Sequence, residues 1–257
     1  MDVRRFVISF ISIVLLLFWG CKEQKEGAII IAVAANMQFA MQEISEAFTK
    51  NTGVRCKLVI SSSGKLTAQI QEGAPFDIFV AANLAYPTEV YKKDRAVYPP
   101  KIYAYGQLVL WSAIDTINPS IKILTNKNIR HIALANPRTA PYGEATINVL
   151  QYYSIYQKLE DKLVYGESIA QTNQFIVSKS SKIGFTAKSV VMSPKMKEVG
   201  HWRAIDRNIY PPIHQAVVML KDKNTYKEDA HRFYDFLFSS EAKEILEDFG
   251  YLTPNVK

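Results

Sequence analysis

The sequence predicts an α/β fold whose sheets contain parallel strands. The segment AIIIAVAAN, residues 28–36, is nearly all apolar, which is typical of a strand buried on both faces of a parallel sheet. Helical and strand patterns then alternate as far as residue 83, and such alternation produces right-handed crossovers between parallel strands. The chain of 257 residues has neither an internal repeat nor a low-complexity linker, so we expect two lobes joined by strands that cross between them.

Residues 1–20 form a predicted signal peptide. Two arginines precede an uncharged run of fourteen residues, 6–19, which is shorter than the roughly 20 apolar residues that a membrane-spanning helix needs. Cys21 directly follows Gly20, as the lipidated cysteine of bacterial lipoproteins follows a small residue, so we expect Cys21 to carry a lipid and residues 21–27 to form a linker. An uncleaved anchor and plain secretion are the alternatives, and all three export the protein.

Charge and cysteine content narrow the possible partners and cross-links. The formal net charge is +7, but the basic residues are scattered and lack the regular spacing with aromatic residues that a nucleic-acid groove needs. If Cys21 is lipidated, Cys56 is the only thiol left in the folded part, and no internal disulfide can form. Cys56 lies in an alternating strand pattern and is expected to be a small core residue.

The first helix is predicted directly after the first strand. Asn36 is placed as its N-cap and Gly53 as its end. Its apolar residues form one stripe of an amphipathic helix, namely Met37, Ala40, Met41, Ile44, Ala47 and Phe48. The elements that follow are a strand, a helix and a strand, at residues 54–62, 64–73 and 76–83.

The rest of the chain continues with strands and helices. Strand patterns lie at residues 106–114, 131–137, 182–191 and 210–220. Helical patterns lie at residues 142–161, 168–180 and 226–250, and Ser168 is placed as the cap of the second. We therefore expect one lobe to comprise residues 28–108 plus 217–257, and the other to comprise residues 109–216.

Four strand-to-helix junctions are candidate binding loops. In open α/β sheets, ligands bind outside the carboxyl ends of the strands, where helices begin. Each junction places free amide donors at the positive end of a helix dipole, where an anion can approach the backbone. The residues are Asn36, Ser63, Tyr142 and Ile169. Each junction alone could be a helix cap and nothing more, but four together favour an anion site.

At these junctions the chain resembles the substrate-binding proteins of bacterial molybdate uptake systems. The stretches that carry the similarity are VAANMQFAMQEISEAFTKNTG, SSSGKLTAQIQEGAPFDIFVAAN, ALANPRTAPYGEAT and AKEILEDFGY. The similarity extends from residue 28 nearly to the end of the chain. It implies the type II periplasmic binding-protein fold, in which each lobe is a mostly parallel sheet flanked by helices and a tetrahedral oxyanion lies in the cleft between the lobes.

In that family, hydroxyls and main-chain amides hold the oxyanion without a cationic side chain. By the matching motifs, Asn36 would contribute its amide and side chain, and Ser63 its amide and hydroxyl. Tyr142 and Ile169 would each donate a backbone amide, that of Ile169 from the second lobe. None of these groups would ligate the metal atom itself.

One group of the family pattern is missing from this sequence. Some members complete the shell with a tyrosine hydroxyl, and the matching position here is Ala187. The hydroxyls of Thr186, Thr139 and Tyr142 are possible replacements, and the sequence does not choose between them.

The resemblance implies an exported protein that captures molybdate, or tungstate of similar size, for the permease of an ABC importer. We expect a monomer without catalytic activity or cofactor, attached to the membrane through its lipid. The alternative is another anion on the same fold, such as sulfate, phosphate or an organic acid. An organic-acid site would usually contain an arginine. Arg138 and Lys65 are the cations near the loops, and we expect both to point to solvent or to a partner surface.

A remote alternative is an exported serine hydrolase. Ser62 and Lys65 satisfy S-x-x-K, the spacing that places a nucleophilic serine beside a lysine one helical turn on. Neither S-D-N nor K-T-G follows downstream, and the four histidines are isolated from one another, which argues against both catalysis and a metal site. Asp77 enters a strand and is expected to make a structural hydrogen bond.

Overall fold

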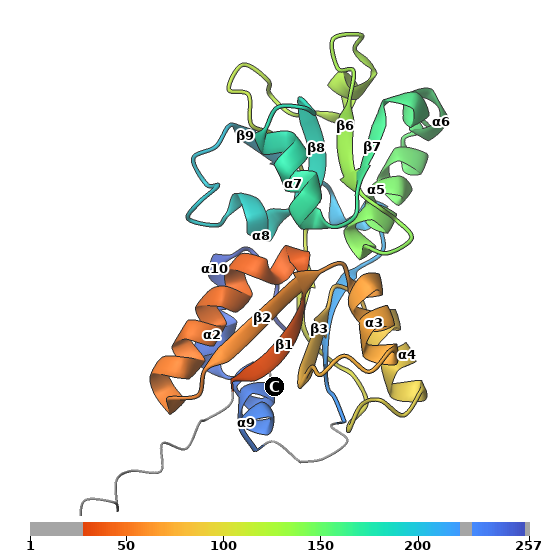
Figure 1. Cartoon of the computed structure of the whole chain (residues 1–257). Helices are drawn as coiled ribbons and strands as arrows, with labels where there is room; N and C mark the ends of the chain where they lie inside the picture. Colours follow the sequence, from red (N-terminus) through yellow and green to blue (C-terminus); the bar gives the residue numbers. More distant parts are fainter. Residues whose placement is uncertain (1–27, 222–227, 255–257) are drawn as a thin grey trace, which may run out of the picture.

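The computed structural model describes residues 28–221 and 228–254, which form two lobes (Figure 1). Each lobe contains a five-stranded sheet flanked by helices. The strand order is β2-β1-β3-β10-β4 in the first lobe and β7-β6-β8-β5-β9 in the second. The two-lobed α/β fold predicted from the sequence is therefore confirmed.

The first sheet is built around β1, Ile29–Ala34, the apolar strand that the sequence predicts. β1 pairs in parallel with β2, Cys56–Ser61, and with β3, Ile78–Ala81. β10, Ile213–Met219, pairs antiparallel with β3 and with β4, Lys101–Gly106. Five of the six β1 residues are buried, because strands lie on both edges of β1 and helices cover both faces of the sheet.

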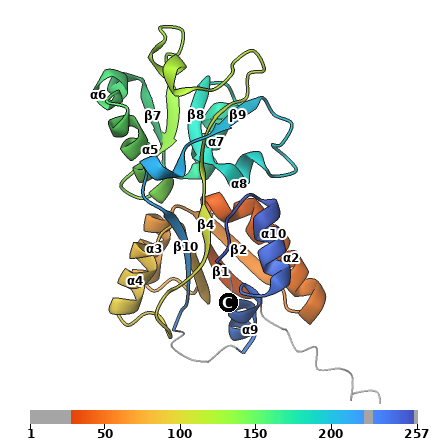
Figure 2. The ribbon, with the colours of Figure 1, turned by 180° about the vertical axis from the view of Figure 1, so that it is seen from behind.

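Two groups of helices cover the two faces of this sheet (Figures 1 and 2). They are η1, Ala35–Met37; α2, Gln38–Thr52; α3, Ser63–Gln71; α4, Ala85–Lys92; α9, Glu228–Phe236; and α10, Ser240–Asp248. The predicted stripe of α2 packs with α9 and α10 in one core cluster, and α3 and α4 contribute to a second cluster. α2 ends at Gly53, whose φ of 77° lies in the left-handed region that glycine adopts without strain.

The second sheet repeats this arrangement. β6, Ile132–Ala135, pairs in parallel with β7, Leu163–Gly166, and with β8, Ile183–Ala187. β5, Leu108–Ser112, pairs antiparallel with β8 and with β9, His201–Ala204. The helices are η2, Ile121–Thr125; α5, Pro141–Tyr152; α6, Tyr156–Leu159; η3, Glu160–Lys162; α7, Ile169–Val177; α8, Lys188–Val191; and η4, Arg207–Ile209.

The chain crosses between the lobes twice. It leaves the first sheet at the end of β4, passes Gln107 and enters β5; it returns between β9 and β10, so the first sheet is completed only by the returning strand. β4 and β10 lie side by side below the second lobe (Figure 2). All of β10 belongs to the first sheet, whereas the boundary expected at residue 216 assigns its first four residues to the second lobe.

Several local expectations differ from the structure. Each sheet has two parallel and two antiparallel strand pairs, because β10 in the first sheet and β5 in the second run against the other four strands; the sheets are thus mixed rather than mostly parallel. The helix predicted at 142–161 is interrupted at Ser154, whose φ is 55°. The helix predicted at 226–250 is divided as well, and Ser239 caps its second half by accepting a hydrogen bond from the amide of Ala242.

The described residues, 28–221 and 228–254, contain no helix with both the length and the hydrophobicity needed to cross a bilayer. The predicted signal peptide, Cys21 and the linker at 21–27 lie outside the described residues.

Candidate functional site

The four predicted junctions lie at the seam between the lobes (Figure 1). Asn36 follows β1 and Ser63 begins α3 in the first lobe, while Tyr142 and Ile169 lie at the starts of α5 and α7 in the second. All four residues are buried, with no more than 3 % of their surface exposed. The residues at the four junctions are therefore shielded from solvent.

The start of α3 has one amide that the chain leaves without an acceptor. The amide of Lys65 donates to Ser62 Oγ at 3.4 Å, that of Leu66 to the Ser62 carbonyl at 3.0 Å, and that of Gly64 to the Thr139 carbonyl at 2.9 Å. The amide of Ser63 alone has no acceptor among the described residues. A helix start leaves such amides pointing outward at the positive end of its dipole.

The Ser63 hydroxyl is oriented by a hydrogen bond that it accepts. Ser63 Oγ accepts a hydrogen bond from the amide of Ala82 at 3.0 Å. A hydroxyl has one proton and two lone pairs, so accepting from Ala82 leaves the proton of Ser63 available for another partner. Ser63 can thus donate from both its amide and its hydroxyl.

The two junctions of the second lobe also present free amides. Pro141 is the first residue of α5 and has no N–H, so the amide of Tyr142 is the first donor of that helix. At α7, Ser168 is the N-cap and its hydroxyl accepts from the amide of Gln171 at 3.4 Å, which confirms the predicted cap. Within the part of the chain that the structure describes, the amides of Tyr142 and Ile169 have no acceptor.

Asn36 has a different role from the predicted N-cap. It lies within η1, and its side-chain amide donates to Gln215 Oε1 at 2.8 Å and to the Tyr251 hydroxyl at 3.1 Å. The Asn36 carbonyl accepts a hydrogen bond from Ser189 Oγ at 2.8 Å, and the Tyr251 hydroxyl donates to Ser189 Oγ at 2.9 Å. Because both side-chain protons of Asn36 are engaged, its main-chain amide is the donor that remains.

The partners of Asn36 in this network lie far from it along the chain. Gln215 and Tyr251 lie 179 and 215 residues from Asn36 along the chain, and Ser189 lies 153 residues away. No local pattern could indicate these pairings, because they depend on tertiary packing that brings β10, α8 and the final residues to Asn36. The network connects Asn36 of the first lobe with Ser189 of the second, beside the site.

The position of the missing tyrosine is occupied by the buried methyl group of Ala187 at the end of β8. Of the three hydroxyls considered as replacements, that of Thr186 donates to Asn173 Oδ1 at 2.6 Å and is therefore engaged. The hydroxyls of Thr139 and Tyr142 are buried and have no partner among the described residues. Burial raises the pKa of the Tyr142 hydroxyl well above its ordinary value, so this group is neutral at physiological pH.

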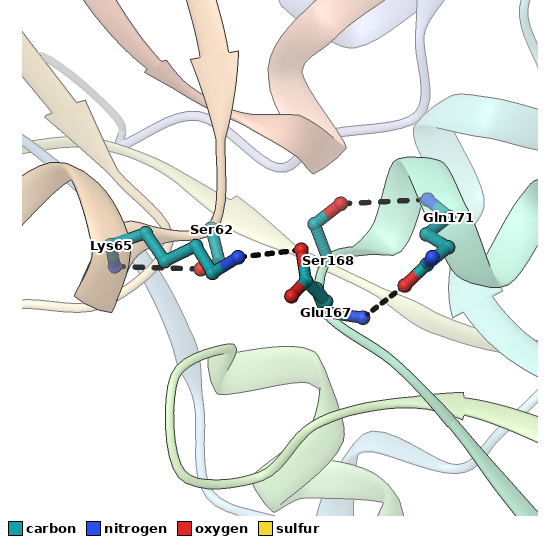
Figure 3. Close-up of polar contacts among 5 residues, drawn as sticks. All are labelled: Ser62, Lys65, Glu167, Ser168 and Gln171. Atoms are coloured by element: carbon teal, nitrogen blue, oxygen red, sulfur yellow. Dashed lines mark hydrogen bonds and ion pairs between the residues drawn. The ribbon is translucent and has the colours of Figure 1, made fainter.

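The site contains no cationic side chain. The buried polar and charged residues in the described part of the chain include no lysine or arginine. Lys65 is exposed, and its ammonium bonds Glu167 Oε2 across the seam at 2.5 Å (Figure 3). Arg138 is also exposed, as the sequence predicts. Buried Asp77 accepts the amide of Ile30 at 2.6 Å, so its predicted structural hydrogen bond is confirmed.

The lobes lie in close contact around this site. Besides the bond from Gly64 to Thr139, the Tyr86 hydroxyl of the first lobe donates to the Arg138 carbonyl of the second at 3.1 Å. A Cβ atom on Gly64 would lie only 3.0 Å from Thr139 Cα, so the close approach of the two loops favours glycine at this position. The structure therefore represents a closed arrangement of the two lobes.

The geometry does not support the serine-hydrolase alternative. The hydrogen bond between Ser62 and Lys65 uses the main-chain amide of Lys65, whereas the lysine ammonium is paired with Glu167 (Figure 3). A lysine that activates a serine must reach its hydroxyl. Within residues 28–221 and 228–254, no group of three or more His, Cys, Asp or Glu side chains could hold a metal ion.

Comparison with known proteins provides independent information. Residues 29–252 match the family model described as bacterial extracellular solute-binding protein. The molybdate-binding protein ModA of Rhodobacter capsulatus is 38 % identical over 230 residues, covering 88 % of this chain and 89 % of that protein. A putative ABC transporter substrate-binding lipoprotein, YvgL of Bacillus subtilis, is 26 % identical, with 89 % of this chain and 87 % of that protein covered.

A solved structure shows the same arrangement of lobes. The periplasmic molybdate-binding protein of Azotobacter vinelandii superposes with a TM-score of 0.83 at 29 % identity, and the match covers 88 % of this chain and all of that chain. The similarity thus spans both sheets, the two crossings and all four junctions.

Proposed function

Because this chain belongs to the family of bacterial extracellular solute-binding proteins, we propose that it captures molybdate, and tungstate of similar size, for an ABC importer. The molybdate-binding relatives from Rhodobacter capsulatus and Azotobacter vinelandii support this ligand. The same relatives are solute-binding proteins rather than enzymes, which agrees with a site that binds an anion without transforming it.

The observation that carries the proposal is a buried set of oriented donors without a cation. The donors are the amides of Asn36, Ser63, Tyr142 and Ile169 together with the Ser63 hydroxyl. A hydrogen bond to a charged group contributes about 1.5–3 kcal/mol, so five such bonds offset much of the cost of desolvating a dianion. Helix dipoles add a favourable field at three of these positions.

A site of this kind selects by geometry and protonation state. Donors fixed at helix starts match one oxyanion radius best, and a smaller sulfate would leave some of them unpaired. A protonated phosphate would bring a donor into a site whose protein groups are themselves donors. An organic acid would usually be met by an arginine, and the arginine nearest the loops, Arg138, is exposed.

We also propose that the chain is exported and carries a lipid on Cys21. Support comes from the signal-peptide pattern at residues 1–20, from the name lipoprotein given to the Bacillus subtilis relative and from the extracellular character of the family. The partner would be the importer's permease. A permease that recognises surfaces of both lobes in their closed arrangement would receive loaded protein in preference to empty protein.

Calorimetric titration of the full-length chain, purified in detergent, with molybdate, tungstate, sulfate and phosphate tests the proposal. We expect tight binding of the first two ions and weak or no binding of the others. Equal or tighter binding of sulfate or phosphate would assign another ligand to the same fold, and hydrolysis of a chromogenic β-lactam would revive the serine-hydrolase alternative.

A further inference from the structure

We infer that the hydroxyl of Thr139 is a further ligand-binding group, which donates a hydrogen bond to the oxyanion and thereby contributes to affinity. This inference rests on the proposed function. Three observations support it. The Thr139 hydroxyl is buried without a partner in the described part of the chain, Thr139 lies between the starts of α3 and α5, and the other candidate hydroxyls are less well placed.

The Thr139 hydroxyl is buried and has no hydrogen-bond partner among the described residues. Buried hydroxyls in folded proteins are nearly always paired, because an unpaired one loses its bonds to water without replacement. A group that the chain leaves unpaired at a binding site is therefore suited to pair with a ligand.

Thr139 also lies in the right place. Its carbonyl accepts the amide of Gly64, which directly follows Ser63, and it precedes Tyr142 by three residues in the same loop. A Cβ atom on Gly64 would lie 3.2 Å from the Cβ of Thr139, so the threonine side chain sits against the serine loop of the opposite lobe. Thr139 is thus positioned between two of the proposed amide donors, one from each lobe.

The competing hydroxyls are less well placed. Thr186 is engaged with Asn173. The Tyr142 hydroxyl lies against the crossing strands, because a Cβ atom on Gly106 of β4 would be 2.1 Å from it and 2.9 Å from Gln215 Nε2 of β10. Tyr142 therefore presents its amide to the seam and its ring to the hinge, while Thr139 remains as the unpaired hydroxyl beside the serine loop.

The position has a consequence for closure. Thr139 belongs to the second lobe and Gly64, which it contacts, belongs to the first. The contact between them therefore depends on the approach of the two lobes. A hydrogen bond from Thr139 to the anion would then favour the closed arrangement of the loaded protein over that of the empty one.

The test compares threonine with its isostere valine in the full-length chain. Calorimetry with molybdate should show a dissociation constant at least tenfold higher for Thr139→Val, and within about threefold of the native value for Thr139→Ser, which keeps the hydroxyl. Thr146→Val is the matched control, because the Thr146 hydroxyl is buried in the same lobe but already donates to the Tyr142 carbonyl at 2.8 Å; its affinity should be unchanged.

Thermal unfolding of the ligand-free proteins separates binding from structure. Thr139→Val should not lower the midpoint, because it removes a hydroxyl that has no partner in the chain, whereas Thr146→Val should lower it. Native affinity in Thr139→Val overturns the inference, as does a loss seen in Tyr142→Phe but not in Thr139→Val. If the native chain binds none of the four oxyanions, the proposed function itself fails, which distinguishes the two outcomes.

Discussion

Lys65 Nζ of the first lobe lies 2.5 Å from Glu167 Oε2 of the second, and this ion pair joins the starts of α3 and α7 (Figure 3). Ser63 and Ile169, whose amides are proposed to hold the ligand, each lie two residues from one member of the pair. The amide of Glu167 is itself fixed by a 2.7 Å hydrogen bond to Gln171 Oε1. The pair therefore spans the seam beside the proposed donors and links the two lobes in their closed arrangement.

Breaking this pair should weaken binding modestly. Both side chains are substantially exposed, and exposed pairs contribute about 0.2–1 kcal/mol, so Glu167→Gln should raise the dissociation constant for molybdate about 1.5- to fivefold. Calorimetry at low and high salt should show the effect shrinking as salt is added. If Glu167 acted only through its negative field, removing its charge would tighten anion binding instead.

Lys65→Ala should have the same modest effect as Glu167→Gln, and the double variant should be no weaker than either single variant. Lys93→Ala is the control, because Lys93 caps the end of α4 and pairs with Glu89 of the same helix, away from the seam. A loss of more than a hundredfold in Lys65→Ala would instead identify Lys65 as a direct ligand and contradict the uncharged site.

Ser63→Ala removes one proposed donor and leaves the Ala82 amide without its acceptor. Loss of a hydrogen bond to a charged group costs about 1.5–3 kcal/mol, so the dissociation constant should rise between about tenfold and 150-fold. Ser239→Ala is a matched control, since it removes the cap of α10 and should lower stability by about 1 kcal/mol without changing affinity. Unchanged affinity in Ser63→Ala would show that the site lies elsewhere.

Gly64→Ala tests the close approach of the lobes. The added Cβ would lie 2.9 Å from the Tyr86 hydroxyl and 3.0 Å from Thr139 Cα, and the second atom belongs to the backbone of the opposite lobe. We expect closure to be impaired, with a scattering radius in saturating molybdate larger than that of the native protein. Thermal unfolding without ligand should change little. A variant that closes like the native protein and binds molybdate with native affinity would show that the two loops can move apart without weakening closure.

Alkaline pH should destabilise the protein through its buried tyrosines. Burial raises the pKa of Tyr103, Tyr142 and Tyr251 in the folded state above the ordinary value of about 10. The folded state therefore favours the protonated tyrosines. Their contribution to the free energy of unfolding is complete below about pH 10 and is lost as the pH rises through the raised pKa values.

Absorbance at 295 nm, recorded together with far-UV circular dichroism, checks this prediction. Exposed tyrosines such as Tyr152 should ionise while the fold persists, and the last tyrosines should ionise only together with the loss of secondary structure. Complete ionisation of all tyrosines before any change in circular dichroism would contradict the expected burial.

The parts of the fold that were predictable have local causes. The apolar run of β1, the stripe of α2, the stop at Gly53 and the cap at Ser168 depend on residues within a turn or two of each other, and the structure confirms them. The starts of α3, α5 and α7 were found for the same reason, since serine, glycine and proline residues mark them in the sequence. Their use by a ligand remains a proposal.

The rest depends on contacts between distant segments. Ser154 interrupts a run of residues that suits a helix, and no nearby glycine or proline signals the break. The side chain of Asn36 suits an N-cap, but Asn36 lies within η1 and its side-chain amide donates to Gln215 and Tyr251, which are distant along the chain. β4 and β7 were missed because their patterns mix exposed and buried positions.

The returning strand β10 also constrains how the protein folds. In the first sheet β10 lies between β3 and β4, yet the whole second lobe separates it from both along the chain. The second sheet is formed by a continuous stretch, residues 108–204, and can assemble from neighbouring segments. The first sheet keeps two unpaired strand edges until β10 is available, so its pairing is the long-range step that should limit the folding rate and leave the half-made sheet exposed to aggregation.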